Sequence, residues 1–265
     1  MLYKYLSLDS LSVESILVQH KVYFASVLNL NDPFEGLPTY RKPSRDEVKQ
    51  HLLRRGAKRK NINKLLPRAI TDIEHNMRLM RSYDQSIAEQ TGIFCVTPHR
   101  DNLLMWSHYA DSHKGICIGL DIKQPHDIEF GVGYNVEYET DYPEICMLQR
   151  DLQMAAQKSG HTLITDDELE DLATKQFYTK SKEWQYEDEL RFIRPKLNGG
   201  VGLMSFNPLQ IKEVIIGCRV SKEKRKEIVE IVSKHCQTAA IYDASISKHK
   251  YELTFKQAFE VAPVC

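Results

Sequence analysis

Two glutamates, Glu187 and Glu189, stand two residues apart immediately before an apolar run. In an extended strand, residues i and i+2 share a face, so this spacing predicts that both carboxylates project the same way, close to Trp184 and Tyr186. Like charges held beside aromatic surface are typical of an acid–base or cation-stabilising site. The alternative is a strand edge whose charges face water, with Arg191 completing a ladder of salt bridges.

A second polar group is the run Asn31-Asp32-Pro33-Phe34-Glu35. Asn and Asp side chains bond to their own backbone and Pro fixes φ, so the composition predicts a turn. Because rigid turns often hold binding residues, Asp32 is also a candidate ligand-binding side chain.

A third group is Trp106-Ser107-His108-Tyr109. On the expected helix, Trp106 and Tyr109 are either core side chains or walls of a ligand site, and His108 could stack on a ring or donate a hydrogen bond. Ser107 and His108 are adjacent in sequence and therefore diverge on a helix, which argues against a hydrolase-type pair.

The composition of the 265 residues is that of a soluble globular protein, with 42% hydrophobic and 27% charged residues and a formal net charge of zero. This neutrality gives no support for bulk electrostatic binding to nucleic acid or to a membrane. No apolar run reaches the roughly 18 residues that suggest a membrane span. The six cysteines form no C-x-x-C pair, so we expect reduced structural thiols in a cytoplasmic protein. The histidines show no ligand spacing, and we expect no metal site.

Apolar periodicity and capping signals predict one α+β domain over residues 1–265 with a central, mostly antiparallel or mixed sheet. The expected strands are 2–8, 22–25, 92–97, 115–121, 134–138, the segment carrying Glu189, 211–216, 239–242 and 251–255. The expected helices are one capped by Ser10 or Ser12, then 103–109 capped by Asp101 or Asn102, 166–177 and 221–236.

Residues 41–90 differ from the rest, because this stretch is polar and shows apolar residues at helical rather than strand spacing. We expect a helical insertion at about 41–90. Its basic run, Arg54 to Lys60, is either a solvated face or a contact for phosphate or nucleic acid.

Taken together, these segments resemble an uncharacterised bacterial family known as domain of unknown function 2971. The resemblance rests on Leu2-Tyr3-Lys4-Tyr5, Val22-Tyr23-Phe24-Ala25-Ser26, Asn29 to Glu35, Leu104 to Ala110, Lys114 to Ile118, Trp184, Tyr186, Glu187, Glu189, Arg191 and Val214 to Gly217. They follow one another in the family's order along nearly the whole chain, but the family carries no known activity.

The order of elements is also similar, more distantly, to the ADP-ribosyltransferase superfamily, above all to its toxins that modify DNA. That resemblance implies an NAD-binding residue on the first strand, a central aromatic segment that packs the nicotinamide, and a late glutamate. The late glutamate would be Glu189, or Glu187 one face-sharing step away. Lys4 stands where the superfamily has Arg or His. The residues expected to bind NAD are Lys4, Tyr5, Asp32, Trp106, His108 and Tyr109.

Three functions follow as hypotheses. The first is an NAD-dependent ADP-ribosyltransferase, a toxin or anti-phage effector that modifies nucleic acid or protein. The second, favoured by Lys4, is a non-catalytic module that binds an NAD-like small molecule on the same scaffold. The third, resting on the basic run from Arg54, is a nucleic-acid-binding protein. The first requires Lys4, Trp106, Tyr109 and Glu189 to border one cavity.

Overall fold

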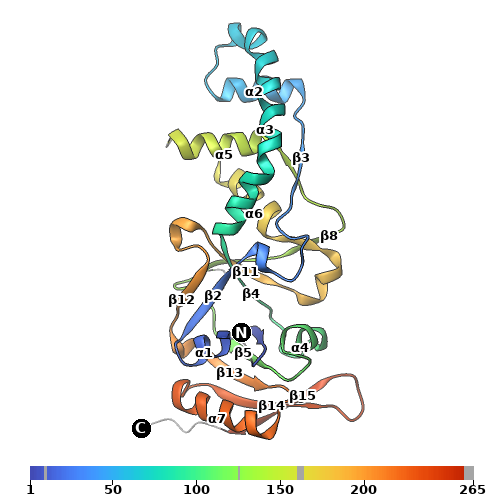
Figure 1. Cartoon of the computed structure of the whole chain (residues 1–265), viewed down its shortest axis with the longest axis vertical. Helices are drawn as coiled ribbons and strands as arrows, with labels where there is room; N and C mark the ends of the chain where they lie inside the picture. Colours follow the sequence, from blue (N-terminus) through green and yellow to red (C-terminus); the bar gives the residue numbers. More distant parts are fainter. Residues whose placement is uncertain (9–10, 125, 160–163, 260–265) are drawn as a thin grey trace. The chain divides into compact units, whose positions relative to one another are not determined.

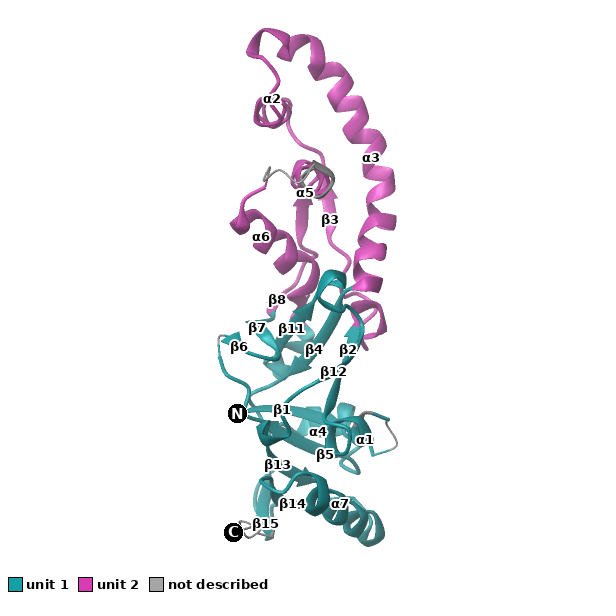
Figure 2. Cartoon of the chain, turned by 90° about the vertical axis from the view of Figure 1, so that its left-hand side faces the viewer, with its two compact units in different colours: residues 1–25, 91–136, 183–265 teal, residues 26–90, 137–182 magenta. Residues whose placement is uncertain are grey.

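The computed structural model describes residues 1–8, 11–124, 126–159 and 164–259, and the chain divides into two compact units (Figures 1 and 2). Unit 1 comprises residues 1–25, 91–136 and 183–265, and unit 2 comprises residues 26–90 and 137–182. Helices and sheets both occur, which confirms the expected α+β class. That the whole chain is one domain with an insertion at 41–90 stays a prediction.

Most of the described strands belong to unit 1. Its elements are β1 (Leu2–Leu6), α1 (Leu11–Leu17), β2 (Lys21–Ser26), β4 (Gly92–Val96), α4 (Leu103–Tyr109), β5 (Ile116–Leu120), β6 (His126–Asp127), β7 (Gly131–Asn135), η3 (Lys182–Glu187), β11 (Leu190–Arg194), η4 (Lys196–Asn198), β12 (Gly202–Ser205), η5 (Pro208–Gln210), β13 (Ile211–Ile216), α7 (Lys222–His235), β14 (Ala240–Ile246) and β15 (Leu253–Phe259). β2 ends and η3 begins one residue inside the neighbouring unit.

These strands form two sheets rather than one central sheet. The five-stranded sheet has the order β1-β5-β13-β14-β15 and is mixed, because β13 and β14 are parallel while the other neighbours are antiparallel. The six-stranded sheet has the order β12-β2-β4-β11-β7-β6. Tyr3 on β1 exchanges backbone hydrogen bonds with Thr97 at the end of β4, which joins the two sheets.

The core of unit 1 follows from the two-residue period of its strands. On β1, Leu2 and Leu6 enter a cluster that also contains Phe94 and Phe192 of the six-stranded sheet, so the two sheets bury their facing sides against each other. Tyr3 and Tyr5, on the opposite face of β1, pack with Trp106 of α4 in a separate cluster.

Unit 2 carries the helices of the 41–90 stretch together with a second stretch of chain. Its elements are η1 (Val27–Asn29), β3 (Thr39–Arg41), α2 (Arg45–Arg54), η2 (Arg59–Asn61), α3 (Ile62–Gln90), β8 (Glu137–Glu139), β9 (Glu144–Cys146), α5 (Met147–Ser159), α6 (Asp166–Phe177) and β10 (Thr179–Ser181). β3 pairs with β9 and β8 with β10, both in parallel.

A buried polar network joins three helices of unit 2. Arg150 of α5 is 1% exposed and places Nη2 2.9 Å from Asp84 Oδ1 of α3. The same nitrogen donates to Gln176 Oε1 of α6 at 2.7 Å, and Tyr40 donates to Asp84 Oδ2 at 2.5 Å. A buried guanidinium is tolerated only when it is paired in this way.

Several predicted elements coincide with the observed ones. α6 spans the expected residues 166–177, β13 spans 211–216, and α7 begins after Ser221, whose side chain accepts from Lys224 N. Asn102, rather than Asp101, caps α4. The cap proposed for the first helix falls on Ser10, which lies outside the described residues, or on Ser12, whose side chain is not described.

Candidate functional site

The segment that carries the two glutamates is not the strand that we expected. Residues up to Glu187 form the 3-10 helix η3, and β11 begins only at Leu190. Asp188 between them has a φ of 44°, in the left-handed region. Glu187 and Glu189 therefore lie on a helix-to-strand turn and not on one face of a strand. They do not face water either, because Glu187 is 2% and Glu189 6% exposed.

Tyr109 holds the first of these carboxylates. Its phenol, at the end of α4, donates to Glu187 Oε1 at 2.6 Å, a charge-assisted hydrogen bond. The other end of α4 is attached to the same segment. Asn102 Oδ1 accepts from Leu104 N and Met105 N as the helix cap, while its Nδ2 donates to the Tyr186 carbonyl at 2.5 Å. Both ends of α4 therefore fix the position of Glu187: Tyr109 binds its carboxylate, and Asn102 binds the carbonyl of the residue before it.

Arg191 holds the second carboxylate. Its Nε and Nη2 donate to Glu189 Oε1 and Oε2 at 2.9 and 3.0 Å, and both side chains are buried. Such a planar fork fixes the orientation of a carboxylate as well as balancing its charge. Cys95 pairs with Arg191 across the β4–β11 ladder, and desolvation together with the Glu189 charge raises the pKa of its thiol.

Lys4, on β1, contacts strand β4. Its Nζ donates to the Cys95 carbonyl at 2.9 Å and lies 5.2 Å from the centre of the Phe94 ring. Lys4, Arg191 and Glu189 are thus the three charged groups that act on the Cys95 thiol. The role of Lys4 in NAD binding stays a prediction, and its ammonium is bonded to the backbone of β4.

Tyr5 and Trp106 have packing roles. Trp106 is fully buried, donates its indole N–H to the Arg100 carbonyl at 2.9 Å and meets the Tyr5 ring edge-on at 5.3 Å. Tyr5 donates its phenol proton to the His99 carbonyl, and burial raises its pKa. Of the two interpretations of Trp106, the structure shows the core one. That Lys4, Trp106, Tyr109 and Glu189 border one cavity stays a prediction.

His108 belongs to an aromatic triad. Its ring centre lies 6.4 Å from that of Trp184 and 6.3 Å from that of Tyr186, and the latter two are 6.0 Å apart. His108 is exposed and the other two are half-buried. Trp184 and Tyr186, directly before the glutamates, form an aromatic surface there, and His108 of α4 adds a third ring to it.

Asp32 lies in unit 2 and shapes a turn. Its Oδ1 accepts from Phe34 N at 2.9 Å and its carbonyl from Glu35 N at 3.3 Å. The predicted turn is confirmed. Asp32 is 4% exposed and fixes the backbone that carries Phe34 and Glu35.

Sequence reasoning missed three groups that complete the glutamate segment. Asn102 was expected as a cap but not as a donor to residue 186. His99, whose Nε2 lies 2.9 Å from Asp188 Oδ2, gave no signal at all, and neither did Cys95. Only Arg191 carried a readable signal, its place two residues after Glu189.

Neither a metal centre nor a membrane span is visible in the part of the chain that is described. No cluster of three or more His, Cys, Asp or Glu residues there could hold an ion. No helix within the described ranges combines the length and apolarity that crossing a bilayer requires.

Comparison with known proteins gives one match. Residues 105–192, about a third of the chain, match the model of a family described as "Protein of unknown function (DUF2971)". The matched range contains Tyr109, Glu187, Glu189 and Arg191 but not Lys4. No curated protein and no solved structure matches the chain.

Proposed function

We propose that this protein is an NAD-consuming ADP-ribosyltransferase whose reaction centre is the turn carrying Glu187 and Glu189. The observation that carries the proposal is the pair of buried carboxylates, each fixed by a donor of the same unit, next to a cluster of three aromatic rings of which Trp184 and Tyr186 directly precede them. Preorganised charge of this kind is what a reaction with a cationic transition state needs.

Cleavage of the ribosyl–nicotinamide bond leaves its electron pair with nicotinamide and develops positive charge on the sugar. The Glu189 carboxylate, held in one orientation by Arg191, would stabilise that charge where it forms. Glu187 would then take the proton of the acceptor as its nucleophilic atom bonds to the sugar carbon. The His108, Trp184 and Tyr186 rings would stack the departing nicotinamide and exclude water.

The proposed acceptor is a nucleic acid or a protein, and the proposed role is that of a toxin or anti-phage effector in the cytoplasm. The resemblance to toxins that modify DNA supports this choice.

The test uses radiolabelled NAD, purified protein and cell extract. We expect label transfer or release of nicotinamide, and a loss of roughly 10²–10³-fold in Glu189→Gln, the size typical for removing one preorganised electrostatic group. The matched control is Glu183→Gln, which changes an exposed glutamate of the 3-10 helix that precedes Glu189. Equal activity of the two variants, or none in the unaltered protein with every acceptor class supplied, contradicts the proposal.

A second candidate is a module that binds an NAD-like ligand without turnover. Lys4 favours it, because its ammonium is bonded to the Cys95 carbonyl and a lysine lacks the planar fork of arginine. Calorimetric titration with NAD distinguishes the candidates: binding without release of nicotinamide supports the module.

The third candidate, nucleic-acid binding through the basic run, has less support. Arg54 pairs with Glu168 and Arg55 with Asp151, so two of its cations already have acidic partners. Salt-dependent retention of an oligonucleotide would revive it.

A further inference from the structure

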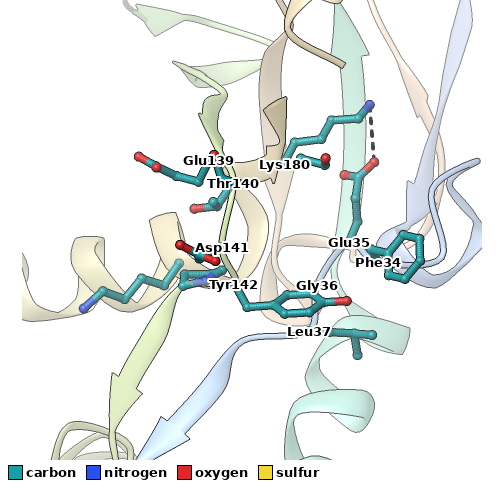
Figure 3. A pocket seen from close by; sticks show the side chains of 13 residues that line it. Phe34, Glu35, Gly36, Leu37, Glu139, Thr140, Asp141, Tyr142 and Lys180 are labelled. Carbon is teal, nitrogen blue, oxygen red and sulfur yellow. Dashed lines mark ion pairs between the residues drawn. The ribbon is translucent and has the colours of Figure 1, made fainter. Parts of the chain in front are cut away.

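Unit 2 contains a cavity of about 230 Å³ whose lining includes neither Glu187 nor Glu189 (Figure 3). The loop 34–37 forms one wall and the segment 139–143 another. Strand β10, together with Lys175 of α6, completes it. All of these residues belong to unit 2, so its elements alone define the cavity.

The walls are held in place by backbone interactions. β10 pairs with β8 so that Ser181 lies opposite Glu139. Thr39 N, at the start of β3, donates to the Pro143 carbonyl at 2.9 Å. This bond connects the chain that follows the loop 34–37 to the segment 139–143. Gly36 has a φ of 71°, and a Cβ there would lie 2.9 Å from Val27 Cγ1. The cavity is therefore largely preformed, as small-molecule sites usually are.

A buried ion pair lines the cavity. Lys180 Nζ lies 3.3 Å from Glu35 Oε1, and the two side chains are 5% and 1% exposed. Burying two charges has a desolvation cost that their attraction often only balances, so such a pair is weak evidence for a purely stabilising role. Next to a cavity it offers a donor and an acceptor side by side.

Two aromatic rings lie at the opening. Phe34 is 62% and Tyr142 46% exposed, so both rings leave part of their surface accessible to a ligand. In Figure 3 the Tyr142 ring extends towards Gly36 and Leu37, with Glu139 and Asp141 on one side and the Glu35–Lys180 pair on the other. Stacking on such a ring suits a flat ligand.

Two carboxylates at the opening of the cavity, Glu139 and Asp141, disfavour the binding of an anionic ligand. Glu139 and Asp141 are exposed and form no ion pair with any residue that the structure describes. Both lysines of the lining have acidic partners, Lys175 with Asp171 and Lys180 with Glu35. A ligand with its own phosphate or carboxylate would meet the two rim carboxylates, whereas neighbouring hydroxyl groups could donate to them.

We propose that this cavity binds a neutral ribonucleoside, with the base on Tyr142 and against the Glu35–Lys180 pair, and the ribose hydroxyls on Glu139 and Asp141. A base edge carries donors and acceptors together, which matches a carboxylate beside an ammonium. At about 230 Å³ the cavity is below the roughly 300–1,000 Å³ of drug-sized ligands, so a nucleoside suits it better than a dinucleotide.

The proposal is tested with adenosine, guanosine, cytidine and uridine as probes, by calorimetry and by amide chemical shifts of the full chain. We expect at least one of them to bind and to shift the resonances of 34–37, 139–143 and 179–181. Its 2′-deoxy form should bind more weakly. Its 5′-monophosphate should also bind more weakly, with a difference that shrinks at high salt because salt screens exposed charges.

Variants locate the binding. Tyr142→Ala should weaken it about tenfold, the order expected for losing one base–aromatic stack, while Tyr142→Phe keeps the ring and should retain it. Asp141→Asn should reduce the preference for the ribonucleoside over its 2′-deoxy form. The matched control is Tyr251→Ala, which removes a fully exposed tyrosine of unit 1.

Absence of binding by all four nucleosides at millimolar concentration overturns the proposal, as does binding that Tyr142→Ala leaves unchanged or that the monophosphate matches. These outcomes do not depend on NAD chemistry, since no NAD is added and Glu189→Gln should bind the nucleoside as the unaltered protein does.

Discussion

Each unit holds a buried carboxylate against a cation, and the two do so differently. In unit 1, Arg191 presents two nitrogens to the two oxygens of Glu189 at 2.9 and 3.0 Å. In unit 2, Lys180 Nζ lies 3.3 Å from Glu35 Oε1 beside a cavity. The guanidinium fork fixes an orientation, whereas a lysine ammonium on a flexible stem keeps donors that can turn towards a ligand.

The difference suggests a division of roles. Arg191 holds Glu189 and Tyr109 holds its neighbour Glu187, so each carboxylate has a fixed orientation before any ligand arrives. That is the property of a reaction centre. The Glu35–Lys180 pair, with exposed rings close by, has the property of a recognition site.

The largest effect that we expect comes from removing the cation of each pair. Arg191→Met leaves the Glu189 charge buried and should lower the free energy of unfolding by roughly 3–5 kcal/mol. Lys180→Met should cost less, because the Lys180–Glu35 contact at 3.3 Å is longer than both contacts of Arg191 with Glu189. Urea denaturation measures both. Fluorescence follows unit 1, where both tryptophans lie, and far-ultraviolet circular dichroism follows the whole chain.

The control for this comparison removes the charge together with its partner. Glu189→Gln/Arg191→Met should recover part of the stability lost in the single variant, since no unpaired buried charge remains. If Lys180→Met is as damaging as Arg191→Met, the distinction between the two sites fails.

Tyr109→Phe sharpens the comparison within unit 1. It deletes only the O–H that Glu187 Oε1 accepts at 2.6 Å, and hydrogen bonds to charged groups contribute roughly 1.5–3 kcal/mol. We expect a loss of about 2 kcal/mol in the fluorescence transition. Tyr251→Phe, at a fully exposed tyrosine of the same unit, should show no change. An unaltered midpoint for Tyr109→Phe would mean that this bond does not hold Glu187.

The sequence was a good guide where local signals decide the structure. Capping residues and apolar spacing located α4, α6 and α7, and loose alternation located the first strand. These outcomes depend on neighbours within a few residues, which a single sequence displays.

Sequence-based prediction failed where residues distant in sequence determine the structure. Aromatic and polar residues alternate over 184–187, which is typical of a strand. In the structure the Tyr186 carbonyl instead accepts a hydrogen bond from Asn102, in another part of the chain. Glu35 and Lys180, which line the cavity of unit 2, are likewise remote in sequence. No local sequence pattern predicts that they pair. We also expected one central sheet instead of two. The bridge between Thr97 and Tyr3 that joins the two sheets connects residues far apart in sequence, so no local pattern shows it.

Gly36→Ala tests whether the cavity of unit 2 is as rigid as its backbone implies. A left-handed φ costs an L-residue roughly 1–2 kcal/mol, and here the added Cβ would also crowd Val27 at 2.9 Å. Gly56→Ala is the matched control, because its φ of 87° is equally unfavourable but nothing lies within 4 Å of the new atom. We expect Gly36→Ala to lose more stability in circular dichroism than Gly56→Ala. Equal losses would indicate a wall that moves aside.

The smallest effect concerns an exposed ion pair of unit 2, which sets a baseline for the two buried ones. Arg54 donates to both oxygens of Glu168 at 2.6 Å, and this bond lowers the pKa of Glu168 from 4.5 to about 2. A carboxyl group whose pKa is lowered in the folded state stabilises that state at pH values above its unfolded pKa. This contribution disappears as the pH falls from 4.5 towards 2.

Since solvent screens the pair, Glu168→Gln should cost only about 1 kcal/mol at pH 7. In urea titrations the difference between the two proteins should close as the pH approaches 2. A difference that persists at that pH would assign the effect to helix capping by Thr165 rather than to the charge of Glu168, because the capping hydrogen bonds do not require an ionised partner.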